Sequence, residues 1–127
     1  IAAVDRVHLI SLQSGLRAGE IEAAAANGVA VYRFDELDID NDMENAAALM
    51  SALDAVVSSQ CWLLHLGGAL GVKVYTFNAR PNPYLMDQDT NPWAPSVEVI
   101  YREHGATWAS AMTEIADRLR ARFERRD

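Results

Sequence analysis

Cysteine and positive charge are scarce in this sequence of 127 residues, and each shortage excludes a class of protein. The single cysteine, Cys61, has no partner in the chain for a disulfide, which excludes a small fold held by internal disulfides and favours a reducing, cytoplasmic compartment. Lys and Arg number 11 against 18 Asp and Glu, a formal net charge of −7, which argues against binding to the phosphate backbone of nucleic acid. No apolar run approaches the ~18 residues of a membrane span, and no signal segment opens the sequence, so neither is expected.

The residues that are present predict one globular domain. Half of them are apolar, and a chain of this length buries about two-thirds of its unfolded surface on folding, which is enough for one core. We therefore expect a single domain over residues 1–127. Because Ile1 is not a methionine, we expect this domain to be a processed, truncated or excised part of a longer chain.

Short β-branched apolar runs alternate with alanine-rich or amphipathic segments. Strands are expected at residues 7–12, 29–34, 54–59, 72–77 and 97–101, and helices at residues 16–27, 43–53, 60–70 and 108–125. Asn41 or Asp42 is expected to cap the second helix, and Gly67 and Gly68 are expected to permit close packing of the third. Since parallel strands need crossover helices, the alternation predicts an α/β fold, a Rossmann-like doubly wound parallel sheet of about five strands with helices on both faces.

Residues 78–96 carry all four prolines and cannot form a long regular element. The segment also contains Tyr84, Leu85, Met86 and Trp93, which is more apolar surface than a flexible linker exposes. We therefore expect an ordered loop.

In open parallel sheets, ligands bind beyond the carboxyl ends of the strands, and this rule selects the candidate positions. They are Gln13, Ser14 and Gly15 after the first strand, Ser58 to Cys61 after the third, Asn78 to Arg80 after the fourth, and Arg102 after the fifth.

The turn Ser58-Ser59-Gln60-Cys61 is the most informative of these positions. A strand ends there and a helix begins, so unpaired N–H groups and the positive end of the helix dipole point outward, a geometry suited to phosphate. A plainer interpretation is that Ser58 and Ser59 only cap the helix. No metal is expected, because Cys61 and His65 have no further ligands nearby, and His65 on this evidence is either a packed core histidine or a ligand contact.

Four segments in order, residues 11–15, 53–58, 65–72 and 91–96, resemble the C-terminal half of GT-B glycosyltransferases. More narrowly, the sequence is similar to the heptosyltransferase-like domains found behind tetratricopeptide repeats in bacterial proteins. The resemblance covers about residues 7–119, and its most specific parts are the run from His65 to Gly71 and the loop from Asn91 to Ser96.

The resemblance implies a lobe that binds the nucleotide diphosphate of a sugar donor, without a separate cofactor. It implies that a second lobe, absent from this sequence, holds a protein or glycan acceptor and supplies the general base, so no catalytic residue is assigned here. The phosphate-binding turn then falls at residues 58–61 and the aromatic loop at residues 84–93. Together with the strand-end positions, the candidate donor-binding set is Gln13, Ser14, Gly15, Ser58, Ser59, Gln60, Cys61, His65, Asn78, Arg80 and Trp93.

Two other hypotheses stay open. Relatives commonly carry a polar pair such as Asp-Thr where this sequence has Gln60-Cys61 followed by Trp62, which leaves fewer side-chain donors for phosphate. The chain could therefore be a degenerate, non-catalytic lobe that serves as a protein-interaction or scaffolding module. A stand-alone small α/β ligand-binding protein is the third hypothesis.

Overall fold

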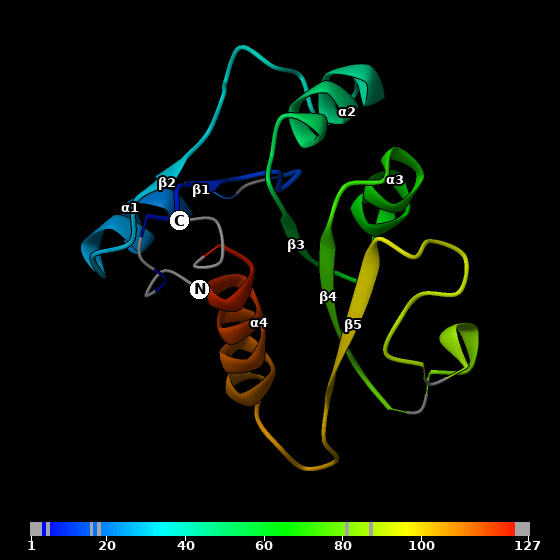
Figure 1. Cartoon of the computed structure of the whole chain (residues 1–127). Helices are drawn as coiled ribbons and strands as arrows, with labels where there is room; N and C mark the ends of the chain where they lie inside the picture. The colour runs from blue at the N-terminus through cyan, green and yellow to red at the C-terminus, as the bar shows by residue number, and fades with distance from the viewer. Residues whose placement is uncertain are drawn as a thin grey trace.

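The computed structural model describes residues 4, 6–15, 17, 19–80, 82–86 and 88–123, and these form a mixed α/β structure (Figure 1). The elements in chain order are β1 (Leu9–Ile10), α1 (Glu20–Ala26), β2 (Val31–Tyr32), α2 (Met43–Ser51), β3 (Val56–Ser59), α3 (Trp62–Leu70), β4 (Val74–Ala79), the 3-10 turn η1 (Pro83–Leu85), β5 (Val97–Arg102) and α4 (Trp108–Phe123). Within the described part of the chain, no helix is long and apolar enough to cross a membrane.

The order and type of the expected elements are confirmed, although most of them are shorter than expected. Asp42 is the residue that caps α2, because its carboxylate accepts hydrogen bonds from the N–H groups of Glu44 (2.9 Å) and Asn45 (3.2 Å). Strand β4 continues to Ala79, two residues beyond its expected end, so Asn78 lies within the strand and not in the loop after it.

The strands form two parallel sheets, whereas one sheet of about five strands was expected. β1 pairs with β2, and β3, β4 and β5 pair in that order. β1 and β2 contribute only two residues each to their ladder, so the first sheet is a short ribbon beside the larger sheet (Figure 1). The parallel α/β character is therefore confirmed, and the continuous five-stranded sheet is not present in this structure.

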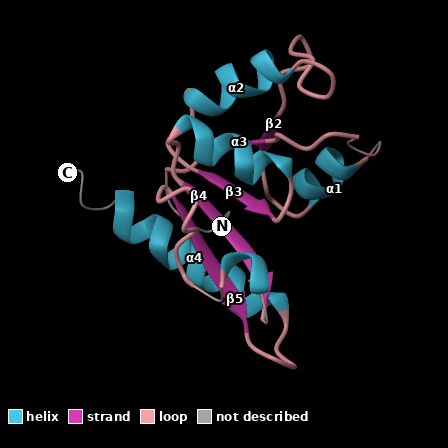
Figure 2. Cartoon of the chain, turned by 90° about the vertical axis from the view of Figure 1, so that its right-hand side faces the viewer, coloured by secondary structure: helices cyan, strands magenta, loops and turns pink. Residues whose placement is uncertain are grey.

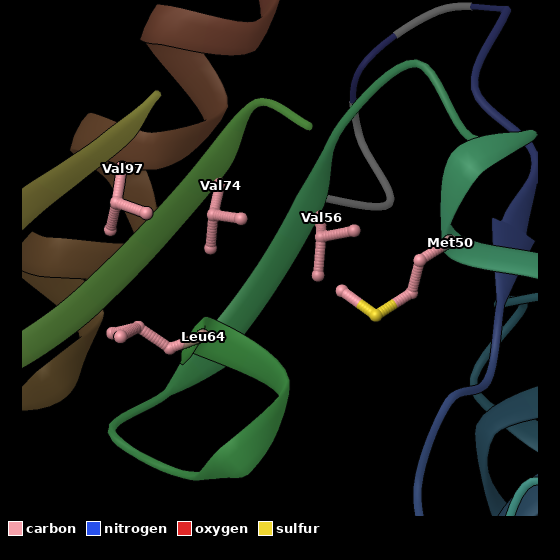
Figure 3. Packing of buried hydrophobic residues seen from close by; sticks show 5 residues of the cluster. All are labelled: Met50, Val56, Leu64, Val74 and Val97. Atoms are coloured by element: carbon pink, nitrogen blue, oxygen red, sulfur yellow. The ribbon is translucent and has the colours of Figure 1, made fainter. Parts of the chain in front are cut away.

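Helices cover both faces of the three-stranded sheet (Figure 2). On one face, side chains of the three strands and of α2 and α3 point toward one another (Figure 3), namely Met50, Val56, Leu64, Val74 and Val97. On the opposite face α4 packs through Ala111, Ile115 and Leu119 against Tyr75 and Ile100. Alternate residues of each strand thus serve opposite cores, as a sheet covered on both faces requires.

The two glycines of α3 bring the helix close to its neighbours. A Cβ at Gly67 would lie 2.6 Å from Cγ2 of Val74, and a Cβ at Gly68 would lie 2.6 Å from Cβ of Ala94. The packing role is confirmed for Gly67, which faces the sheet. Gly68 instead leaves space for Ala94 of the proline-rich loop, which packs against the helix at this position.

This loop, residues 80–96 apart from positions 81 and 87, packs against the domain through a few buried residues. Leu85 and Asn91 are buried, and the Oδ1 atom of Asn91 accepts from the N–H of Trp93 at 2.9 Å. Tyr84, Met86 and Trp93 are exposed. The loop is ordered as expected, but most of its large apolar side chains face solvent.

An ionic cluster lies at the amino ends of β4 and β5. Glu98 accepts from Lys73 and, at 2.7 Å, from Arg118, which also pairs with Glu114 at 2.5 Å. Partial burial opposes ionisation of Glu98, but the hydrogen bonds and charges of Lys73 and Arg118 outweigh it and lower the pKa of the carboxyl group. The cluster joins the sheet to α4 at the end opposite to the candidate ligand positions.

Candidate functional site

A cleft of about 1130 Å³ lies between β1 and β3 and extends to their carboxyl ends. Gln13 and Ser14 line it from the turn after β1, and Ser58, Ser59 and Cys61 line it from the turn after β3. Residues that are some 45 positions apart in sequence therefore share one cavity, and they belong to the two turns singled out from the sequence. This cleft is the candidate site.

The turn between β3 and α3 positions its side chains by a short local contact. The Oγ atom of Ser58, which is buried, lies 3.2 Å from Sγ of Cys61. Cys61 is the N-cap of α3, and its side chain makes no cap hydrogen bond to the first N–H groups of the helix. The interpretation of Ser58 and Ser59 as helix caps is therefore wrong, because both residues precede the cap position and Ser58 lies within the sheet.

The first turn of α3 lines the cleft through Cys61, Trp62 and Leu63. A helix leaves its first N–H groups without partners inside the helix, and together they carry the positive end of the dipole. The turn after β3 can therefore receive an anionic group from the cleft. Phosphate binding at this turn stays a prediction, and its side chains contribute fewer donors than an Asp-Thr pair would.

The turn after β1 is held by hydrogen bonds to its own neighbourhood. The side-chain amide of Gln13 donates to Glu20 at 3.0 Å, and its backbone N–H donates to Oγ of Ser11 at 3.3 Å. Gly15 adopts φ of 62°, which a residue with a side chain rarely does, so the glycine allows the chain to reverse after β1. Gln13 and Ser14 face the cleft, while Gly15 acts as a turn residue and is not among the described lining residues.

Of the remaining candidates, Asn78 and Gln60 brace the site from outside, whereas Arg80 lies away from it. The side-chain amide of Asn78 donates to Oε1 of Gln60 at 2.6 Å, which ties the end of β4 to the turn after β3. Arg80 stacks 3.9 Å above the ring of Tyr101 and pairs with Asp89 at 3.2 Å. Its guanidinium is held on the β5 side of the sheet, away from the β1–β3 cleft.

His65 and Trp93 also lie outside the described lining of the cleft. His65 is exposed on α3, which excludes the core interpretation, and its ring meets that of Tyr84 edge to face with centroids 6.1 Å apart. Trp93 is 69% exposed. The structure thus brings together five of the candidate residues and leaves six around or beyond the rim.

The inner wall of the cleft is apolar and was not anticipated as part of a site. Val57, Phe77, Leu119 and Phe123 line it from β3, β4 and the last turns of α4. The sequence shows these positions only as core-facing residues of a strand or an amphipathic helix, and periodicity does not distinguish a filled core from the wall of a cavity. The resulting chemistry is a polar rim at the strand ends above an apolar wall, which suits a ligand with an anionic group and a flat ring.

Two further observations concern other positions or ligands that a site could have. A second hollow of about 390 Å³ lies at the opposite, amino ends of β3 and β4, near Asp54 and Lys73, where the strand-end rule places no ligand. Within the described ranges, no group of three or more His, Cys, Asp or Glu residues is arranged to hold a metal ion.

Comparison with known proteins gives a partial match to a longer protein. The chain is 28% identical over 115 residues to Protein FlbA of Caulobacter vibrioides, an alignment that covers 90% of this chain and 19% of FlbA. The chain therefore spans about a fifth of the length of this relative. No family model and no solved structure matches the sequence.

Proposed function

We propose that this chain is the donor-binding lobe of a nucleotide-sugar-dependent glycosyltransferase, and that the diphosphate binds at the turns after β1 and β3. The observation that carries the proposal is the shared cleft, which joins Gln13 and Ser14 to the first turn of α3. This juxtaposition favours a ligand that contacts both turns at once.

The chemistry of the cleft supports a nucleotide diphosphate. Its anionic oxygens fit the free N–H groups and hydroxyls of the rim, and the nucleoside fits the apolar wall beside Phe77. Transfer of the sugar requires stabilisation of the departing diphosphate, which a helix N-terminus provides without a metal. The acceptor and the general base belong, in this proposal, to a second lobe.

The proposal includes a finer description of the fold. The two sheets correspond to one Rossmann-like sheet, in which β1 and β3 flank the point where the strand order reverses, the usual position of a ligand in such folds. We also propose a cytoplasmic location and an attachment to a tetratricopeptide-repeat segment. The lone thiol of Cys61 is compatible with a reducing compartment.

A nucleotide panel tests the proposal. UDP, GDP, ADP and their sugars are titrated into the protein, and binding is measured from amide chemical shifts in NMR and from the unfolding temperature. At least one nucleotide is expected to shift the resonances of Ser14 and Ser59. Ser59→Asp, which adds a negative charge to the rim, should abolish binding, while the same change at exposed Ser110 should leave it intact. The absence of any response from the unaltered protein to the whole panel would refute donor binding.

A second candidate, a non-catalytic lobe used as an interaction module, is favoured by three observations. The side chain of Gln60 is engaged with Asn78, Cys61 provides no cap bond, and Trp62 and Trp93 are exposed. In this case the double replacement Gln60→Asp with Cys61→Thr confers no nucleotide binding, and Trp93→Ala weakens binding to a protein partner in a pull-down assay. A nucleotide response that the double replacement creates or strengthens would contradict this candidate.

A further inference from the structure

Three large aromatic side chains are exposed on α3 and on the proline-rich loop beside it. Trp62, Tyr84 and Trp93 are 37%, 53% and 69% exposed. An exposed apolar ring forgoes the free energy that its burial would provide. Single exposed rings are common on protein surfaces, whereas rings that lie together indicate a binding surface.

The rings follow one another along α3, beginning at the cleft. Trp62 lines the cleft, and His65 comes three residues later, so their side chains are neighbours on the surface of the helix. The exposed His65 meets the ring of Tyr84 edge to face, with centroids 6.1 Å apart. The row thus passes from the rim of the cleft to the loop.

The loop continues the row one helical turn further on. A Cβ at Gly68 would lie 2.6 Å from Cβ of Ala94, so Ala94 packs directly onto α3 there. Trp93, the residue before Ala94, therefore stands beside the same side of the helix. We call these four residues the aromatic strip: Trp62, His65, Tyr84 and Trp93.

Buried neighbours fix the backbone that carries the two loop rings. Leu85, next to Tyr84, is fully buried. Asn91 is also buried, and its Oδ1 atom accepts from the N–H of Trp93 at 2.9 Å. The backbone at both rings is thus ordered before a ligand arrives, which lowers the entropy lost on binding.

The surroundings of the rings favour a carbohydrate as the ligand. Between Tyr84 and Trp93 the loop exposes the polar side chains of Gln88, Asp89 and Thr90, whereas the centre of a protein interface is depleted of charge and more apolar. A pyranose sugar has C–H groups that stack on the negative face of an aromatic ring, and hydroxyls that bond to polar side chains around it. The strip offers both kinds of group.

Charge narrows the choice of ligand further. Single-stranded nucleic acid also stacks on aromatic rings, but it needs a positively charged groove. The chain has a formal net charge of −7, and Arg80, at the start of the loop, pairs with Asp89 at 3.2 Å. The strip therefore suits uncharged sugars better than nucleic acid or acidic sugars.

We propose that the aromatic strip binds a chain of uncharged pyranose sugars that runs along α3 toward the cleft. Trp62 belongs to both the strip and the cleft, so the two surfaces are continuous. In the proposed glycosyltransferase, the strip holds sugar units of the acceptor that lie away from its reacting hydroxyl, while the second lobe holds the reacting end. This acceptor role rests on the proposed donor site, whereas the binding itself does not.

Titration with neutral oligosaccharides tests the binding. Maltohexaose, cellohexaose and chitohexaose are added separately to the protein, and binding is measured from tryptophan fluorescence and from chemical shifts in NMR. At least one of them is expected to bind and to shift the resonances of His65 and Trp93. If none of the three produced a response, the proposal would be overturned.

Substitutions test whether the strip is the binding surface. Tyr84→Ala and Trp93→Ala should each weaken oligosaccharide binding at least fivefold. The matched control is Tyr32→Ala, because Tyr32 is 54% exposed on β2 and lies outside the strip, and it should leave the affinity within twofold. Equal losses at Tyr84 and Tyr32 would overturn the assignment to the strip.

A second pair of substitutions separates stacking from general apolar contact. Trp93→Phe keeps a flat ring, whereas Trp93→Leu keeps only apolar surface, so the phenylalanine variant should bind at least threefold more tightly. Equal affinities of the two variants would contradict stacking. A protein partner that Trp93→Ala releases, together with no response to the three oligosaccharides, would assign the strip to a protein and overturn the proposal.

One substitution distinguishes the strip from the donor site. Ser59→Asp should abolish nucleotide binding and leave oligosaccharide binding within twofold. Oligosaccharide binding without any response to the nucleotide panel would support the strip and refute the donor site with the acceptor role. Nucleotide binding without any response to the oligosaccharides would refute the strip and leave the donor site standing.

Discussion

Gly67 of α3 lies so close to β4 that a Cβ at this position would be 2.6 Å from Cγ2 of Val74 and 3.0 Å from Cε of Met50. The helix rests directly on the sheet here, and Val74 is fully buried. Because Gly67 has no Cβ, α3 can lie this close to the sheet. The same close contact sets the position of the first turn of α3 at the cleft.

Replacement of this glycine is therefore expected to destabilise the domain. Gly67→Ala gains up to about 1 kcal/mol in helix propensity but forces Val74 aside in a packed core, and overpacking of this kind costs about 1–3 kcal/mol. Chemical denaturation should show a net loss of stability. Adding Val74→Ala removes the clashing methyl groups, so the double variant should lose less than the sum of the two single changes. Full additivity would contradict the contact.

The cap of α2 is a second point where one side chain determines stability. Asp42→Ala removes the acceptor for the N–H groups of Glu44 and Asn45 and should cost about 1 kcal/mol in denaturant unfolding. Asp40→Ala removes the same charge two residues earlier, outside the cap, and is the control. Equal losses for the two variants would indicate a charge effect and not a cap.

The ionic cluster around Glu98 predicts that the free energy of unfolding falls at low pH. Because Lys73 and Arg118 lower the pKa of this carboxyl below its value in the unfolded chain, its contribution is complete above the unfolded value and is lost as the pH falls through the folded one. Stability should therefore fall from about pH 5 downward. Glu98→Gln should lower the unfolding temperature at pH 7 and reduce this acid-dependent loss. Glu103→Gln, at an exposed position, should change neither the unfolding temperature at pH 7 nor the loss of stability in acid. If the unaltered protein, Glu98→Gln and Glu103→Gln gave parallel pH profiles, the ion pairs of Glu98 would not be the cause.

A comparison of Trp93 with Phe77 tests whether a nucleotide binds in the cleft or over the proline-rich loop. Since Trp93 lies outside the described lining of the cleft, Trp93→Ala should leave the affinity for a bound nucleotide within about twofold, as measured by isothermal titration. Phe77→Ala, which removes part of the apolar wall, should weaken the same binding by tenfold or more, since a buried ring contributes of order 2 kcal/mol. Its fold is checked by circular dichroism, because Phe77 also packs against α4. The reverse ranking would place the ligand over the proline-rich loop.

Most of the fold was predictable from local signals. Asn27 and Gly28 end α1, Asp42 begins α2, and the apolar stripe of α4 faces the sheet, all as their residue types and spacing indicate. The site was predictable only in part. The strand-end rule selected the turns after β1 and β3, but nothing local indicated that His65 is exposed or that the side chain of Gln60 is engaged by Asn78.

The sequence by itself determined the alternation of strands and helices, their parallel arrangement and the two turns that carry the polar rim, because periodicity, caps and breakers act between residues close in the chain. Only the tertiary structure decided that β1 and β3 stand apart with a cleft between them, and that Phe77 and Phe123 form its wall. A core residue and a cavity-lining residue have the same hydrophobic pattern. They differ only in what packs against them, and that is set by segments distant in sequence.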